Sequence, residues 1–136
     1  MKKTIYLMLM GILPLALGAL VNVIVTSVQM PVFLISLAAL FVWYFMSHKM
    51  CYSMADFYAL NAPATIFIIL IAVQELMLHS YIGGVGVMCQ MFFLPFLSVG
   101  ATLLGGLGNM FAIYFGSYAV MLLCSLIGAR QKVKGK

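Results

Sequence analysis

The chain has 136 residues, of which 66% are hydrophobic and 7% charged, and its mean hydropathy is +1.21. Soluble domains carry about 25% charged residues, so this composition excludes an ordinary soluble globule and indicates one polytopic membrane domain with the lipid bilayer as its solvent. The net charge is +5, but the basic residues lie almost entirely at the two termini, which leaves no basic face for nucleic acid.

The placement of the basic residues predicts the orientation. Lys2 and Lys3 open the chain, Lys49 is the only interior cation, and the other four cations lie in a tail at about residues 129–136. Because positive charge is retained on the cytoplasmic side, we expect both termini to be cytoplasmic in a bacterial inner membrane. The tail is predicted to be disordered and to contact anionic lipid. The first apolar run continues to Val25, which favours an uncleaved helix over a signal peptide.

The first span is predicted at about residues 4–27, with a kink at Pro14. Pro14, Gly18, Asn22 and Thr26 follow one another at steps of four and therefore share one helix face. Small residues on such a face let a second backbone approach, and Asn22 offers a hydrogen bond across the contact. Gly18 and Asn22 are therefore expected to pack against another helix.

The second span is predicted at about residues 31–47, with Trp43 and Tyr44 marking a membrane interface. A cytoplasmic loop then covers about residues 48–61. Sulfur and imidazole ligands suit Cu(I), so the loop region contains a candidate set for that metal. Its members are Met46, His48, Met50, Cys51 and Met54. Methionine is abundant throughout the chain, which favours packing over metal binding, and no metal or cofactor is predicted.

The third span is predicted at about residues 62–79, capped by Asn61 and with Pro63 in its first turn. Glu75 and His79 lie four residues apart and would share a helix face, with Gln74 beside them. Glu75 lies about 20 Å along this helix, near the outer interface. Two interpretations stay open: a hydrated or paired interfacial carboxylate, and a proton- or cation-responsive pair.

The remaining apolar chain, about 60 Å of helix, is twice the thickness of a bilayer and must break. Its glycines at residues 105–108 predict the break, with Asn109 capping a last span at about residues 110–127. Ala112 and Gly116 offer a small-residue contact in that span. An odd number of spans would put one basic terminus outside. We therefore predict an all-α protein with four transmembrane helices, in which residues 88–104 form a re-entrant or interfacial helix. Five full spans are the alternative.

No catalytic motif is present, so the chain is not predicted to be an enzyme. We expect a small accessory, assembly or immunity-type membrane factor that associates with other membrane proteins or with itself. One alternative is a small transporter or channel component. Its polar route would be lined by Asn22, Gln29, Gln74, Glu75, His79 and Asn109. The second alternative is a holin-like pore former.

Overall fold

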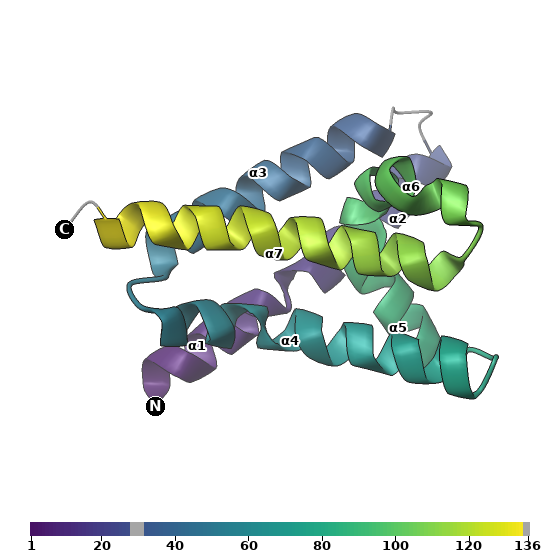
Figure 1. Ribbon diagram of the computed structural model, residues 1–136, viewed down its shortest axis with the longest axis horizontal. Helices are drawn as coiled ribbons and strands as arrows, with labels where there is room; N and C mark the ends of the chain where they lie inside the picture. Colours follow the sequence, from purple (N-terminus) through teal and green to yellow (C-terminus); the bar gives the residue numbers. More distant parts are fainter. Residues whose placement is uncertain (28–31, 135–136) are drawn as a thin grey trace.

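The structure is a computed structural model that describes residues 1–27 and 32–134, and in this part of the chain all regular secondary structure is helical (Figure 1). Five helical segments are long and apolar enough to be candidate membrane spans. They cover Lys2–Ile24, Val32–Met50, Met54–Met77, Gly83–Leu107 and Met110–Gln131. By helix length and composition this is a multi-pass membrane protein of the all-α class.

The first segment is divided into α1 (Lys2–Gly11) and α2 (Leu13–Ser27). The break falls at Ile12, just before Pro14, whose ring removes a backbone donor from the helix. The predicted kink is therefore confirmed. At the break Gly11 lies directly against α4, where a Cβ would come within 2.3 Å of the Leu60 carbonyl oxygen. A glycine is needed there because the two backbones are in contact.

The loop predicted at residues 48–61 is mostly helix. The helix α3 covers Val32–Met50, and α4 begins at Met54 and ends at Ala72. The helix start lies at Ser53 because Ser53 and Asp56 form a capping box, which satisfies backbone donors at both positions. The predicted cap at Asn61 is therefore wrong: Asn61 and Pro63 lie inside α4, and both are buried.

The segment Gly83–Leu107 is bent, and we refer to it as the bent segment. It consists of α5 (Gly83–Phe93), a 3₁₀ turn at Leu94–Phe96, α6 (Leu97–Leu104) and a second 3₁₀ turn at Gly105–Leu107. This is longer than the predicted helix at residues 88–104. Pro95 lies in the first 3₁₀ turn, where its missing N–H and its ring interrupt the α-helix.

Contacts fix the direction of both arms of the bent segment. The α5 arm runs back along α4, because Cys89 lies by Gln74 while Phe92 stacks on Phe67. The α6 arm then returns along α7, with Gly100 packed on Ser117. Figure 1 shows both arms at the end of the molecule opposite the two chain termini. The bent segment therefore enters and leaves at one end, while the other four segments run along the long axis.

The last helix, α7, covers Met110–Lys134. The predicted break is confirmed: Gly108 has a left-handed backbone with φ 64°, and the Asn109 side chain accepts a hydrogen bond of 2.8 Å from the Phe111 N–H. The prediction of a disordered tail from residue 129 is wrong, since the helix continues to Lys134. Gly128 and Ala129 are buried, and Gly128 lies against α3, so packing extends the helix beyond the apolar stretch.

Aromatic side chains from the bend form the centre of the core. Phe92, Phe93 and Phe96 are all at most 1% exposed. Phe96 makes an edge contact with Trp43 at a ring distance of 6.4 Å, and Phe93 makes another with Tyr118 at the same distance. The prediction that Trp43 marks a membrane interface is wrong, because Trp43 is 1% exposed and its ring is used in helix packing.

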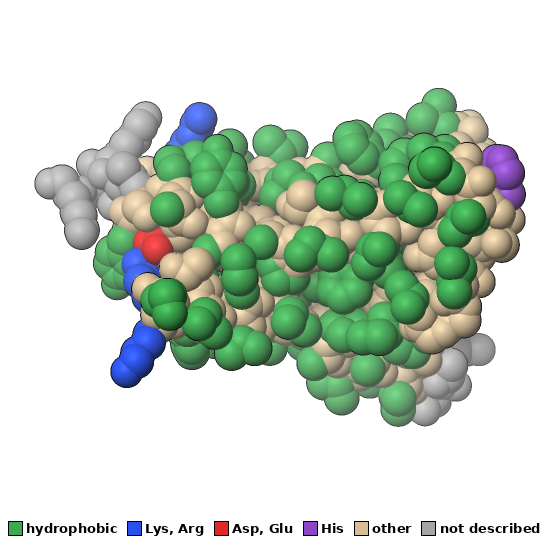
Figure 2. Space-filling model, turned by 90° about the horizontal axis from the view of Figure 1, so that it is seen from below, with side chains coloured by type: hydrophobic (Ala, Val, Ile, Leu, Met, Phe, Trp, Pro, Cys, Tyr) green, Lys and Arg blue, Asp and Glu red, His purple; other side chains and the backbone are tan. Residues whose placement is uncertain are grey.

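The charged residues are divided between the two ends of the bundle. Lys3 pairs with Asp56, Lys49 lines a pocket with Lys3, and Arg130 lines a groove that begins at Met54. We call this the basic end. Glu75 and His79 follow the last turns of α4 at the other end, which we call the far end. In Figure 2 blue and red side chains gather at one end of the visible face and purple ones at the other.

Candidate functional site

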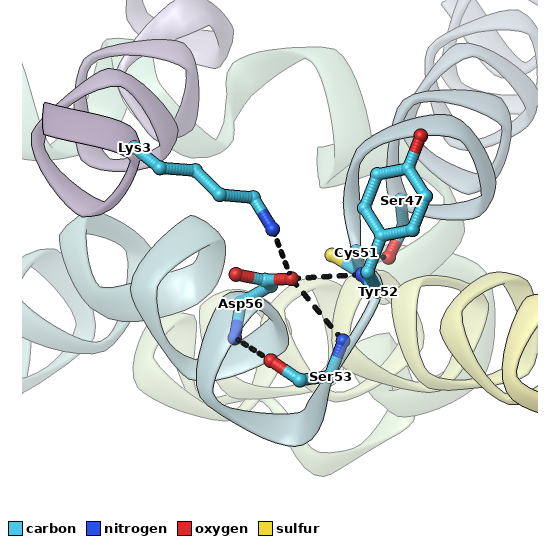
Figure 3. A network of polar contacts seen from close by, with 6 residues as sticks. All are labelled: Lys3, Ser47, Cys51, Tyr52, Ser53 and Asp56. Atoms are coloured by element: carbon cyan, nitrogen blue, oxygen red, sulfur yellow. Dashed lines mark hydrogen bonds and ion pairs between the residues drawn. The ribbon is translucent and has the colours of Figure 1, made fainter.

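Asp56 holds together the polar surface of the basic end (Figure 3). Its Oδ2 accepts hydrogen bonds from Lys3 Nζ at 2.6 Å, from the Tyr52 N–H at 2.8 Å and from the Ser53 N–H at 3.1 Å. The Ser53 hydroxyl in turn accepts from the Asp56 N–H at 3.2 Å. One carboxylate thus caps α4, orders the turn that precedes it and attaches α1 to that turn.

A buried polar cluster lies one to two helical turns further in, where α3, α4 and α7 meet. Ser47 Oγ donates to the Ser125 carbonyl at 2.7 Å and lies 2.9 Å from the Ser125 hydroxyl. Asn61 Nδ2 donates to the Ser125 hydroxyl at 2.8 Å and to the Phe57 carbonyl at 2.9 Å. All three of Ser47, Asn61 and Ser125 are at most 3% exposed. Hydrogen bonds of this kind hold helices together where lipid offers no alternative partner.

Four of the five candidate Cu(I) ligands have different surroundings. His48 Nδ1 lies 3.2 Å from the Gly128 carbonyl, and the buried Cys51 thiol lies 3.5 Å from the Ser47 hydroxyl. Met46 packs against the core, whereas Met54 is exposed at the start of α4. No group of three or more His, Cys, Asp or Glu side chains that could hold a metal occurs in the part of the chain that the structure describes.

At the far end the predicted Glu75–His79 pair is separated by a change in the backbone. Residues Val73–Met77 form a π-helical turn, and His79 follows it with φ 48°. His79 therefore lies outside the helical turn that carries Glu75, and the regular helical spacing from which the pair was predicted does not continue to it. His79 is exposed and Glu75 half-buried. π-helical turns and left-handed non-glycine residues are both enriched at functional sites.

Gln74 and Tyr81 fold the connection between α4 and α5. Gln74 is 3% exposed; it donates to the Leu70 carbonyl at 3.1 Å and accepts from the Ile82 N–H at 2.8 Å. The Tyr81 hydroxyl is buried and has no hydrogen bond of good geometry among the described residues. Burial, followed by the neighbouring Glu75 carboxylate, raises the pKa of Tyr81 well above its usual range. Tyr81 is thus a neutral phenol beside a carboxylate.

Three of the polar residues predicted to line a transport route make different local contacts. Asn22 lines a small pocket of about 180 Å³ with Gln90 and Tyr114. Gln74 is used by the α4–α5 connection, and Asn109 caps α7. Gln29 lies outside the described residues. The hydrogen bonds of Gln74 and Asn109 therefore give both side chains structural roles.

Two of the small residues expected at helix contacts, Gly18 and Gly116, lie directly against another segment. A Cβ on Gly18 would come within 1.7 Å of the Met91 carbonyl oxygen, and one on Gly116 within 2.9 Å of the Leu104 side chain. Ala112, one turn before Gly116, is half-buried. The partner in the first two contacts is the bent segment, so these glycines hold it in the bundle.

Comparison with known proteins found no matching family model, no matching curated protein and no matching solved structure. The sequence reasoning missed the Ser47–Asn61–Ser125 cluster. Its signal was present, because Ser47 and Ser125 are hydroxyls within long apolar helices, but their pairing across 78 positions of sequence has no local pattern.

Proposed function

We propose that the chain crosses a bacterial inner membrane four times and that the bent segment is re-entrant, with both termini in the cytoplasm. The support is the direction of the two arms, which begin and end at the far end. Interrupted backbone at membrane depth is tolerated only when protein covers it, and Phe93, Pro95 and Phe96 at the bend are buried. The cations then lie together on the side that the positive-inside rule assigns to the cytoplasm.

A reporter enzyme fused after Lys136 tests this topology. Alkaline phosphatase is active only in the periplasm, so we expect an inactive fusion, and a second fusion after Gly106 should be active. Five full spans would reverse the C-terminal result. In that case the bent segment would have to straighten, and its packing on α4 and α7 would be lost.

Within that topology we propose a non-enzymatic membrane factor that acts by association with other membrane helices or with a second copy of itself. The observation that carries this proposal is a groove of about 390 Å³ between α1 and α4. Every side chain that lines it is apolar, and those of Ala62 and Pro63 are short. Small residues at such a surface allow a second helix to approach closely.

Cysteine cross-linking at the groove tests association. Cys51 and Cys89 are fully buried, so replacing Cys124 by serine leaves a chain without an accessible thiol. In that background we expect Ile66→Cys, at the groove, to give a discrete cross-linked product in native membranes. Phe41→Cys is the control, since Phe41 is 68% exposed on α3. The absence of a product at both positions would contradict the proposal.

The far end supports a second candidate, a proton- or cation-responsive component. It rests on the π-helical turn at Glu75 and on the buried Tyr81 hydroxyl beside that carboxylate. Proteoliposomes loaded with a pH-sensitive dye test it. This candidate would be favoured over the association factor if the wild type gives proton flux above background and Glu75→Gln lowers it. Asp56→Asn, at the basic end, should lower the flux less. Background flux in all three would remove it.

A further inference from the structure

A second groove runs along the outer surface between α4 and α7. It has a volume of about 580 Å³ and is lined mainly by carbon, with Phe57 and Tyr58 from α4 and Phe115, Ala119 and Leu122 from α7. We call it the α4–α7 groove. Tyr58 and Phe115 are 65% and 50% exposed and form raised rims, whereas the half-buried Ala119 leaves a low floor. Tyr118 also lines the groove, and its hydroxyl lies 3.0 Å from the Thr65 hydroxyl.

The α4–α7 groove is apolar along most of its length and basic at one end. Phe115 and Arg130 are separated by fifteen positions on α7, which is about 22 Å of helix. Arg130 lines the groove beside Met54, at the basic end of the bundle. The structure thus combines a long apolar trough with a guanidinium at one end of it. A guanidinium binds phosphate through two parallel hydrogen bonds, which gives it geometric selectivity.

We infer that the α4–α7 groove is a binding site for one anionic phospholipid, with an acyl chain along Ala119 and Leu122 and the phosphate on Arg130. A partner helix could cover the apolar part, but it would have to bring a carboxylate to Arg130 as it buried that charge. An anionic lipid is already present at this depth and supplies the counter-charge without ordering a second protein. The inference needs Arg130 at a headgroup layer, on either side of the membrane, and so does not depend on which face is cytoplasmic.

Lipid retention tests this site. The full chain is extracted from vesicles of phosphatidylcholine with or without phosphatidylglycerol, and bound lipid is counted by native mass spectrometry. We expect the wild type to retain one phosphatidylglycerol in preference to phosphatidylcholine. Arg130→Gln should reduce that preference about fivefold, the effect of one cation near an anionic headgroup. Ala119→Trp should remove the retained lipid of both kinds by filling the floor.

Lys49→Gln is the matched control, because it removes the same charge at the same end but lies outside the groove. It should retain lipid like the wild type. Equal losses in Arg130→Gln and Lys49→Gln would show diffuse attraction and overturn the site. Full retention in Ala119→Trp would do the same, as would a cross-link from Leu123→Cys to another polypeptide. Ala119→Leu, a smaller change, together with the helix signal in circular dichroism, separates loss of the lipid from loss of the fold.

Discussion

The two halves of the bundle are held together by different interactions. Near the basic end, side-chain hydrogen bonds connect helices that are distant in sequence: Ser47 and Asn61 both bond Ser125, and Lys3 reaches Asp56. In the far half the hydrogen bonds of Thr102 and Asn109 stay within four residues along the chain, and those of Gln74 reach at most fifteen residues, to Cys89 in the next segment. There the bent segment is held by glycine contacts and stacked aromatic rings.

The difference follows from what each half contains. In the basic half α3, α4 and α7 lie close enough to exchange hydrogen bonds between side chains. The far half must hold a segment whose backbone is interrupted at Pro95, and close packing around Gly18 and Gly100 brings that segment against α2 and α7. Replacing polar side chains should therefore destabilise the basic half most. Replacing glycines by larger residues should weaken the packing of the bent segment on its neighbours.

The largest effect is expected from Gly18→Ala. The new Cβ would lie 1.7 Å from the Met91 carbonyl oxygen, a distance at which the backbones must separate. Overpacking of this kind costs about 3 kcal/mol, which unfolding in mixed micelles of rising dodecyl sulfate content would measure. Gly106→Ala is the control, since nothing lies within 4 Å of the added carbon. Equal unfolding midpoints in both variants would mean that α5 does not pack on α2.

A smaller effect is expected from the buried cluster of the basic half. In a double-mutant cycle of Asn61→Ala and Ser125→Ala, the two changes should couple by about 0.6 kcal/mol and by no more than about 1.7 kcal/mol, the range measured for hydrogen bonds between membrane helices. Thr102→Ala removes a local hydrogen bond to the Ser98 carbonyl in the far half and should change stability little. If the stability losses of the two single variants simply add up in the double variant, the hydrogen bond between Asn61 and Ser125 does not hold the basic half together.

The surface of the basic end contributes through a helix cap and an ion pair, both made by Asp56. Asp56→Ala removes a helix cap, and we expect a loss of about 1 kcal/mol. Lys3→Gln removes only the ion pair, in which the lysine side chain is 54% exposed, so the loss should stay under about 0.5 kcal/mol and disappear at high salt. The same unfolding titration measures both variants. If they lose equal stability, Asp56 stabilises the protein through the ion pair and not through the helix cap.

Local signals in the sequence predicted part of this fold. Composition identified the membrane class, Pro14 the kink in the first segment, and the glycines before Asn109 the last break. Those features depend on residues close together in the chain. The start of α4 was missed although Ser53 and Asp56 form a capping box, because Asn61 and Pro63 together offered a more conventional helix start.

The contacts between segments could not be predicted from local signals in the sequence. Trp43 and Tyr44 are adjacent aromatics near a cation, a pattern typical of a membrane interface, yet Trp43 is buried in the core, where its ring contacts Phe96. Ser47 and Ser125 are unremarkable in sequence, and only the approach of α3 to α7 makes them partners. Periodicity shows which residues share a face, but it does not show which other face they meet.

The smallest predicted effect concerns strain at the far end. His79 has φ 48°, a left-handed conformation that costs a side-chain-bearing residue about 1–2 kcal/mol. Glycine adopts it freely but loses about 0.5–1 kcal/mol more conformational entropy on folding. His79→Gly should therefore stabilise the protein by about 0.5 kcal/mol, whereas Ser80→Gly, at a residue without positive φ, should destabilise it. If His79→Gly also destabilises, the imidazole makes an interaction worth more than the strain, and the far end would be the better place to look for function.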